Sequence, residues 1–276
     1  MPLSDPPRCM RHWSSNSRFN PVEENRPLQL IRVVASLGFL AAFASAQMPM
    51  PRAGYRFPIG QTLTYDVDWR LLSAGTATLK VEPAGTNVRV VGTGDSIGAI
   101  ALLYHVHDRF ESLVDPTNYC SLSLSKQTEE GFRRITTNIS YDYSRSLSVL
   151  SEKNLKNNQS KRQENAIPGC VSDVLSSIFY VGSLPLAPGA TYTFPINDGG
   201  KTSVVDLKVE GKEDIKTAAG TYHTIRVQPQ TQNAPVKNKG QIWLWFSDDD
   251  RHVPVQMRAR LFWGTLTLRL AKAETK

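Results

Sequence analysis

The sequence lacks most of the patterns that would assign a chemistry to it. It contains neither a glycine-rich phosphate loop nor a dinucleotide-binding fingerprint. It has only three cysteines in 276 residues. Its one long uncharged, mainly apolar run, residues 33–44, is about a dozen residues, short of the roughly 20 that cross a bilayer. These absences argue against a nucleotide-binding fold and against a membrane span in the mature protein.

The first 46 residues read as a leader followed by an export signal. Residues 1–25 are polar, contain four prolines and show no periodicity, so we expect a disordered leader. Residues 26–46 combine Arg26 and Arg32, the apolar run and a small-residue cleavage site that ends at Ala46. We therefore predict a signal peptide that is cleaved near Ala46, with an uncleaved anchor as the alternative. Because Gln47, and not a cysteine, stands directly after Ala46, a lipid anchor is not expected.

Cleavage would leave 230 of the 276 residues, enough to bury a sizeable core in a single β-rich domain, residues 47–276. Residues 1–46 carry five basic and three acidic residues, so their removal lowers the net charge from +7 to +5. The remaining basic residues are scattered along the chain, and no nucleic-acid motif accompanies them. The sequence thus predicts a protein of the periplasm or the exterior that does not bind nucleic acid.

One segment, Val171–Val181, has the apolar spacing of an α-helix. The residues of its apolar stripe are Val171, Val174, Leu175, Ile178 and Phe179. Pro168 and Gly169 interrupt the chain before it, and Ser172 or Asp173 can cap its first turn. We expect a core helix that lies on a sheet, with a ligand-gating helix as the alternative.

Most of the remaining chain alternates between apolar and polar residues, with turns at short and regular intervals, which is typical of a β-meander. Residues 98–104 form a short apolar patch in which we expect one helical turn. Residues 151–166 are polar and aperiodic, and an exposed loop is expected there.

The stretch Gln241–Phe246 differs from the other strands because it is apolar on both faces. Ile242, Leu244 and Phe246 form one face, and Trp243 and Trp245 form the other. Such a strand must be covered on both sides, by the helix on one and by a second layer or a barrel interior on the other. The predicted fold is therefore mostly β: a curved antiparallel sheet that forms a barrel, half-barrel or sandwich, with one main helix packed against it.

The mature chain keeps two cysteines, Cys120 and Cys170. An exported protein meets oxidising conditions, under which these two cysteines can form a disulfide. It would close a loop of about 50 residues and add roughly 3–4 kcal/mol on the chain-entropy model. The alternative is two buried free thiols.

Two patterns resemble catalytic or metal sites without meeting their full requirements. Gly94–Gly98 fits G-x-S-x-G, but a nucleophile elbow needs a helix that starts directly after Ser96, and meander strands surround it. His105 and His107 share one face of a strand, yet no third ligand stands in register with them. We expect a loop serine and a half-exposed polar face.

The acidic residues give no clear site either. The run Asp248–Asp250 lacks the spacing of an EF-hand, and a solvated turn is expected. The pairs Asp66/Asp68 and Asp108/Glu111 would suit glycoside hydrolysis only if two carboxylates faced each other across a cleft. No catalytic residue, metal ligand or cofactor is therefore predicted.

Four motifs, taken together, resemble a known family. The first is Asp66–Val81 with the tyrosine before it, which reads Y-x-V-x-W…A-G-x-A-x-L-x-V; the second is Arg109–Asp115. The third, Asp173–Tyr180, is similar to D-x-L-S-x-x-Y-Y, and the fourth, Trp243–Val255, to W-x-S-D-D-x-x-R-x-P-V. The chain thereby resembles domain of unknown function 3108, a family of exported bacterial proteins, over about residues 55–270.

The resemblance implies a mostly β protein of the Gram-negative envelope with no assigned activity, so no catalytic residue carries over from it. In architecture alone, the expected fold is also similar to the half-barrel lipoprotein carriers of the periplasm, in which a curved sheet wraps helices. That likeness bears little on function.

Three functions remain open. The first is a non-catalytic envelope protein that binds or carries an apolar or amphipathic ligand such as lipid in a deep pocket. Its candidate pocket residues are Trp69, Phe110, Phe179, Trp243, Trp245 and Trp263. The second is a structural or interaction scaffold with a filled core and no pocket. The third is an envelope glycan hydrolase, which would need two facing carboxylates about 5–10 Å apart. The sequence does not identify a protein partner.

Overall fold

The computed structural model describes residues 48–232 and 240–276, so the predicted leader and signal peptide lie outside the described residues. Within these described residues, fourteen strands form one antiparallel sheet, and two short helices, α1 (Gly98–Leu103) and α2 (Ser176–Ser183), lie in its connections. Neither helix is long and apolar enough to cross a membrane. The prediction of a mostly β fold with one main helix is confirmed.

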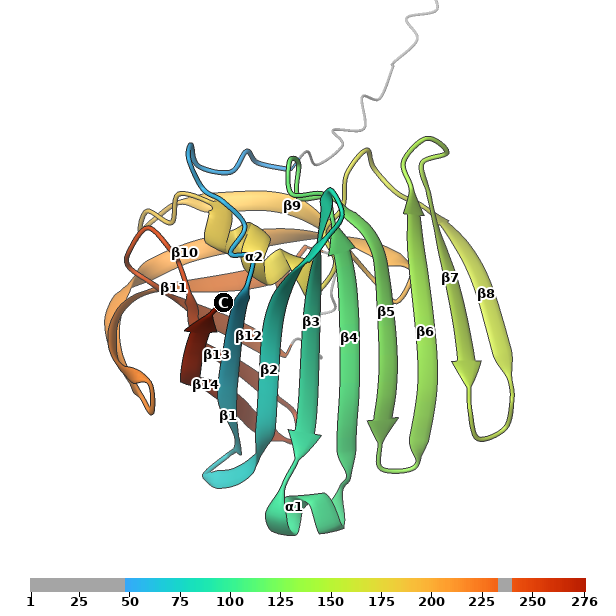
Figure 1. Ribbon diagram of the computed structural model, residues 1–276, viewed down its shortest axis with the longest axis horizontal. Helices are drawn as coiled ribbons and strands as arrows, with labels where there is room; N and C mark the ends of the chain where they lie inside the picture. The colour runs from blue at the N-terminus through green and yellow to red at the C-terminus, as the bar shows by residue number, and fades with distance from the viewer. Residues whose placement is uncertain (1–47, 233–239) are drawn as a thin grey trace, which may run out of the picture. The chain divides into compact units, whose positions relative to one another are not determined.

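Strands that follow each other in the chain are neighbours in the sheet, with the exception of β8 and β9. The strands are β1 (Gln61–Trp69), β2 (Leu72–Ala84), β3 (Asn87–Ser96), β4 (Val106–Val114), β5 (Ser121–Glu130), β6 (Arg133–Asp142), β7 (Leu147–Asn154), β8 (Ser160–Ala166), β9 (Thr191–Asp198), β10 (Lys201–Thr217), β11 (Gly220–Thr231), β12 (Gln241–Ser247), β13 (Pro254–Leu261) and β14 (Gly264–Thr275). Their order, β8 to β1 followed by β14 to β9, joins two meanders through the β1–β14 pair. The sheet is not closed, because β8 and β9 are its two edges (Figure 1).

The hairpin of β7 and β8 occupies residues for which the sequence predicts a loop. That prediction for 151–166 is wrong, although most of these side chains are exposed as expected. β8 reads Ser-Lys-Arg-Gln-Glu-Asn-Ala and buries none of its residues, so it has no alternation for the pattern to reveal. Charged side chains on an edge strand also discourage pairing with another chain.

The helix starts later than its apolar spacing predicts, at Ser176 instead of Val171. The first residues of the predicted helix are extended and bridge two strands. The amide of Ser121, the first residue of β5, donates to Val171 O at 2.9 Å, and Ser172 pairs in parallel with Ile196 of β9. Satisfying these strand carbonyls and amides outweighs the local helical pattern.

Asp173 fixes the N-terminal end of α2. Its side chain is fully buried, and its Oδ1 accepts the amides of Leu175 and Ser176 at 2.8 and 2.9 Å. Its Oδ2 accepts the hydroxyls of Ser112 on β4 and Ser121 on β5 at 2.5 and 2.7 Å. One carboxylate therefore caps the helix and attaches it to two strands.

A disulfide lies close to the hydrogen bonds of Asp173, which we call the seat of α2. Cys120 and Cys170, 50 positions apart, are bonded to each other. Cys120 immediately precedes β5, and Cys170 precedes the extended residues that lead to Asp173. The covalent link therefore tethers the start of the α2 segment to the same strand that supplies Ser121.

His252 fixes the other end of the helix. Its imidazole is buried in the turn between β12 and β13, and Nδ1 contacts Gly182 O at 2.8 Å. The amide of Arg52 donates to Ser183 O at 2.9 Å. These contacts satisfy carbonyls that the end of an α-helix leaves without partners.

The sheet bends around α2, so that the two meanders meet the helix from different sides (Figure 1). Leu175 packs against β3 at Gly92, where a Cβ would lie 2.9 Å from a Leu175 methyl. At the other end of α2, a Cβ on Gly182 would lie 3.5 Å from the ring of Phe246 on β12. The main core lies between the two meanders, and its members come from both.

Direct contacts also join the two meanders beyond the helix. Lys126 on β5 pairs with Asp198 at the end of β9. The hydroxyl of Tyr141 on β6 donates to Asn197 O at 3.2 Å. The open sheet is thus held in a bent form by α2 and by contacts from β5 and β6 to β9.

We predict that Asp173→Ala lowers the free energy of unfolding by about 3 kcal/mol, measured by urea denaturation. The loss combines a missing helix cap with buried amides and hydroxyls that no longer have their acceptor. Asp142→Ala is the matched control, because Asp142 accepts the Ser144 hydroxyl and the Arg145 amide in an exposed turn. The control should change stability much less. A loss below about 1 kcal/mol for Asp173→Ala would contradict this role.

We also predict that His252 makes stability pH-dependent. Burial lowers its pKa, although the Gly182 carbonyl acts in the opposite direction. The contribution of His252 is therefore complete above about pH 6.5, the ordinary value in the unfolded chain, and declines as the pH falls through the lowered folded value.

The check is the loss of unfolding free energy between about pH 8 and about pH 5. This loss should be smaller in His252→Asn than in the unchanged protein, since asparagine does not titrate and tolerates the backbone φ of 43° at this position. Equal losses in the two proteins would show that His252 does not contribute.

Candidate functional site

The six predicted pocket residues lie in three separate places. Phe110 and Phe179 pack in the main core. Trp69 and Trp263 lie together where β1 ends and β14 begins, with ring centroids 6.3 Å apart. Trp243 and Trp245 are on β12, on the face opposite the core residues Leu244 and Phe246. The structure does not bring the six into one pocket wall.

Trp243 and Trp245 are covered by charged side chains and not by a second layer. The guanidinium of Arg258 lies over the Trp245 ring at 5.4 Å, and that of Arg260 over the Trp243 ring at 5.5 Å. Trp245 Nε1 donates to Glu213 at 2.8 Å. The prediction that this face meets a second layer or a barrel interior is therefore wrong. Arginine side chains of the adjacent strand shield the indoles through cation–π contacts.

Aromatic side chains fill the space between α2 and the surrounding strands. The ring of Phe57 lies 5.3 Å from that of Tyr119 and 5.6 Å from that of Phe179. The ring of Tyr180 lies 4.9 Å from that of Phe194 and 6.1 Å from that of Tyr119. These five residues come from the segment before β1, the β4–β5 turn, α2 and β9, so the helix is packed from several sides.

Two open hollows occur on the described part of the chain. One, of about 370 Å³, is lined by residues 54–59 with Gln61, Asp250, Arg251 and Thr275. The other, of about 430 Å³, lies on β6, β7 and β8 and includes Glu152 and Lys161. Neither is lined by any of the six predicted pocket residues, and both contain charged side chains.

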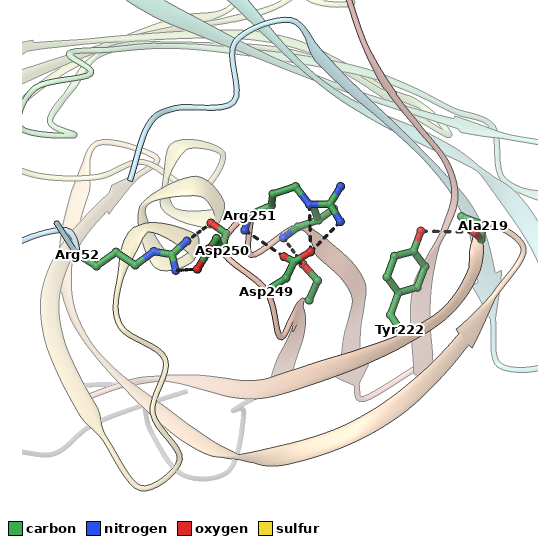
Figure 2. Close-up of polar contacts among 8 residues, drawn as sticks. Arg52, Ala219, Tyr222, Asp249, Asp250 and Arg251 are labelled. Atoms are coloured by element: carbon green, nitrogen blue, oxygen red, sulfur yellow. Dashed lines mark hydrogen bonds and ion pairs between the residues drawn. The ribbon is translucent and has the colours of Figure 1, made fainter. Parts of the chain in front are cut away.

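The turn between β12 and β13 beside the first hollow is held by its own ion pairs (Figure 2). Asp249 accepts the Arg251 guanidinium at 2.7 Å and the Ser247 hydroxyl at 2.7 Å. Burial raises the pKa of Asp249, but these hydrogen bonds outweigh it and hold the pKa below its ordinary value. Asp248 pairs with Lys212 at 2.7 Å, and Asp250 with Arg52 at 3.9 Å. Each aspartate of the run is thus neutralised by a neighbour, as in a structural turn.

The carboxylate pairs considered for hydrolysis do not face each other across a cleft. Asp108 and Glu111 are three residues apart on β4 and therefore point to opposite faces. Asp68 is paired with Arg269. Burial, with a smaller effect from the Glu130 carboxylate, raises the pKa of Asp108 to about 6. Asp108 is the one aspartate or glutamate among the described residues whose pKa is clearly raised.

The other chemical patterns have structural partners. Ser96 is the last residue of β3, and its hydroxyl accepts the Val106 amide at 2.9 Å. The surrounding sheet is antiparallel, whereas a nucleophile elbow belongs to an α/β-hydrolase sheet. His107 pairs with Asp95 at 2.5 Å, whereas His105 precedes β4 and is exposed. Within residues 48–232 and 240–276, no three His, Cys, Asp or Glu side chains are grouped to hold a metal ion.

The sequence reasoning missed one surface feature. Five connections lie on the same side of the sheet, where strands end and the next ones begin. They are residues 70–71, 97–105, 131–132, 155–159 and 262–263. We call them the apolar rim. Ten of the thirteen exposed large apolar side chains among the described residues lie in these connections or directly beside them. The apolar dipeptides Leu102-Leu103 and Phe262-Trp263, which lie between predicted strands or at their ends, are the sequence signal that could have revealed it.

Strand register places these connections together. Successive antiparallel strands return the chain, so the β1–β2, β3–β4, β5–β6 and β7–β8 connections share one edge (Figure 1). Trp69 at the end of β1 lies opposite both Leu72 and Leu266, which adds the β13–β14 connection to this edge.

Among solved structures, the fold is similar to a beta-barrel-like protein of domain of unknown function DUF1849 from Brucella abortus. That match has 8% sequence identity and a TM-score of 0.55, and it covers 80% of this chain and 100% of the other. A protein from Bacteroides fragilis, described as exported and as having a YmcC-like fold, matches at 9% identity with a TM-score of 0.36, over 80% of this chain and 99% of the other.

No curated protein matches the sequence. A family model does match it, over residues 64–271, and confirms the resemblance seen in the motifs. The Brucella structure supports the fold alone, because so low an identity does not carry function. The chain belongs to the family described as "Protein of unknown function (DUF3108)".

Proposed function

We propose that the protein is an exported, non-catalytic scaffold of the cell envelope, which acts through its surface and not through an internal pocket. The observation that carries this proposal is the filling of the concave side of the sheet by α2. Phe179 and Tyr180 are almost completely buried there, in contact with aromatic side chains from three other segments. The proposed location rests on the predicted signal peptide.

The carrier alternative needs an apolar cavity that is large enough for a lipid chain. Its strongest candidate residues, Trp243 and Trp245, lie on the face away from the core and beneath arginine side chains. The two hollows are open and partly lined by charge. A ligand pocket is typically concave and mostly apolar, so these features favour the scaffold.

The hydrolase alternative needs a pair of carboxylates with space for a sugar between them. Asp108 has a pKa suited to a general acid, but burial and the nearby Glu130 account for it. The carboxylate pairs that the sequence suggested are divided between two faces or paired with arginine. We therefore propose no catalytic residue.

The scaffold proposal is tested by asking whether the interior of the protein contains a bound lipid. Protein extracted under native conditions should release no stoichiometric lipid when it is denatured and analysed by mass spectrometry. A lipid recovered in a fixed ratio to the protein would overturn the scaffold in favour of the carrier.

Phe179→Ala provides a second measurement on the same point. In a filled core, this substitution should lower the free energy of unfolding by about 3–5 kcal/mol, because it leaves a cavity among the aromatic rings. The control Phe262→Ala removes a fully exposed ring and should change stability by less than about 0.5 kcal/mol. Similar small effects of the two substitutions would mean that Phe179 borders empty space, as a ligand pocket requires.

A further inference from the structure

The apolar rim exposes side chains that the fold itself does not use. Leu71, Leu102 and Phe262 are 97%, 90% and 101% exposed. Helix α1 has six residues and buries none of them. A helix this short is not stable by itself in water, and packing normally supplies its stability. Because neither core packing nor helix stability explains these apolar residues, their exposure indicates a partner surface.

The rim is an ordered edge, because adjacent connections contact each other. Trp69 and Trp263 join the β1–β2 and β13–β14 turns, and Gly264 permits the approach: a Cβ there would lie 2.6 Å from Trp69 Nε1. Tyr104 at the end of the α1 segment packs on the β5–β6 turn, where a Cβ on Gly131 would lie 2.9 Å from the Tyr104 ring. The connections that carry the exposed side chains are therefore held against each other before any partner binds.

The charge of the rim has one sign. Its five connections contain no aspartate or glutamate, but they include Arg70 and Lys156. Arg70 lies 5.4 Å from the centroid of the Trp69 ring, and Lys156 lies 5.1 Å from that of the Phe132 ring. At the opposite edge, the β12–β13 turn carries Asp248–Asp250. Aromatic and aliphatic tips combined with cations are the composition that binds an anionic lipid interface.

We propose that the apolar rim docks on the surface of a lipid bilayer that contains anionic headgroups. The rim follows ten strands, from β13 to β8, which is roughly 40 Å along the curved edge. Its apolar side chains project in small groups from five separate connections. Each apolar side chain can insert into a bilayer independently of the others, whereas a stable protein partner needs a continuous and complementary patch. The proposal names a partner for the scaffold and in that sense rests on the proposed function.

The experiment measures co-sedimentation of the full chain with vesicles of phosphatidylglycerol and phosphatidylcholine. The triple variant Leu102→Ser, Leu103→Ser, Phe262→Ser should bind at least about tenfold more weakly, because three apolar side chains no longer enter the interface. The matched control is Met50→Ser with Ile59→Ser, which removes exposed apolar side chains outside the rim. The control should bind like the unchanged protein. All three proteins share the same N-terminal residues, so the difference reports on the rim.

Two further measurements test the geometry and the charge. Tryptophan emission should be quenched by vesicles that contain brominated lipid, and Trp263→Phe should remove at least about half of that quenching, since Trp263 lies at the rim. Lys156→Gln should weaken binding to the anionic vesicles about fivefold and leave binding to phosphatidylcholine alone unchanged. Equal melting temperatures of the variants would exclude misfolding, because these side chains are exposed or partly exposed.

The proposal is overturned if the triple variant and the control bind vesicles equally, or if Trp263→Phe leaves the quenching intact. Self-association or binding of another protein through the rim in the absence of lipid, lost in the triple variant, would also overturn it. A lipid recovered from the interior would refute the scaffold but would leave vesicle binding by the rim unchanged. The two proposals therefore fail separately.

Discussion

A buried carboxylate fixes α2, the helix on which both meanders pack, to the first meander. Asp173 accepts four hydrogen bonds, two from the amides of Leu175 and Ser176 at the start of α2 and two from serines on β4 and β5. It has no lysine or arginine partner among the described residues. An acceptor in this environment is costly to leave unsatisfied, so the helix cannot shift without breaking contacts with the sheet. The bend of the open sheet, and with it the filled interior, depends on this seat.

A single-layered sheet must also manage two kinds of exposed surface. On the outer face of β12, arginines shield the indoles and no second layer is needed. At the edges, β8 exposes charged residues, and β9 contains Pro195 and pairs in part with Ser172. These arrangements protect strand edges and large apolar surfaces from unspecific association. The apolar rim leaves large apolar side chains exposed even beside Arg70 and Lys156, which is why we propose that a partner surface covers it.

Much of the fold could be predicted from local patterns. A strand with one solvent-exposed face is recognisable because apolar and polar residues alternate along it. The short turns between such strands predict a meander. The failures have physical causes: β8 is exposed on both faces and shows no period, and residues 171–173 join strands although their spacing is helical. Trp243 and Trp245 suggested a pocket because sequence alone does not reveal that arginines on the next strand cover them. The rim was missed because its connections meet only after the register is known.

If the bent sheet depends on the packing of α2, amide hydrogen exchange in Asp173→Ala will reveal it. We expect protection to fall together in α2, in β4 and β5, and in β9, since all are joined through the residues around Asp173. Faster exchange confined to α2, with the strands as protected as in the unchanged protein, would contradict it.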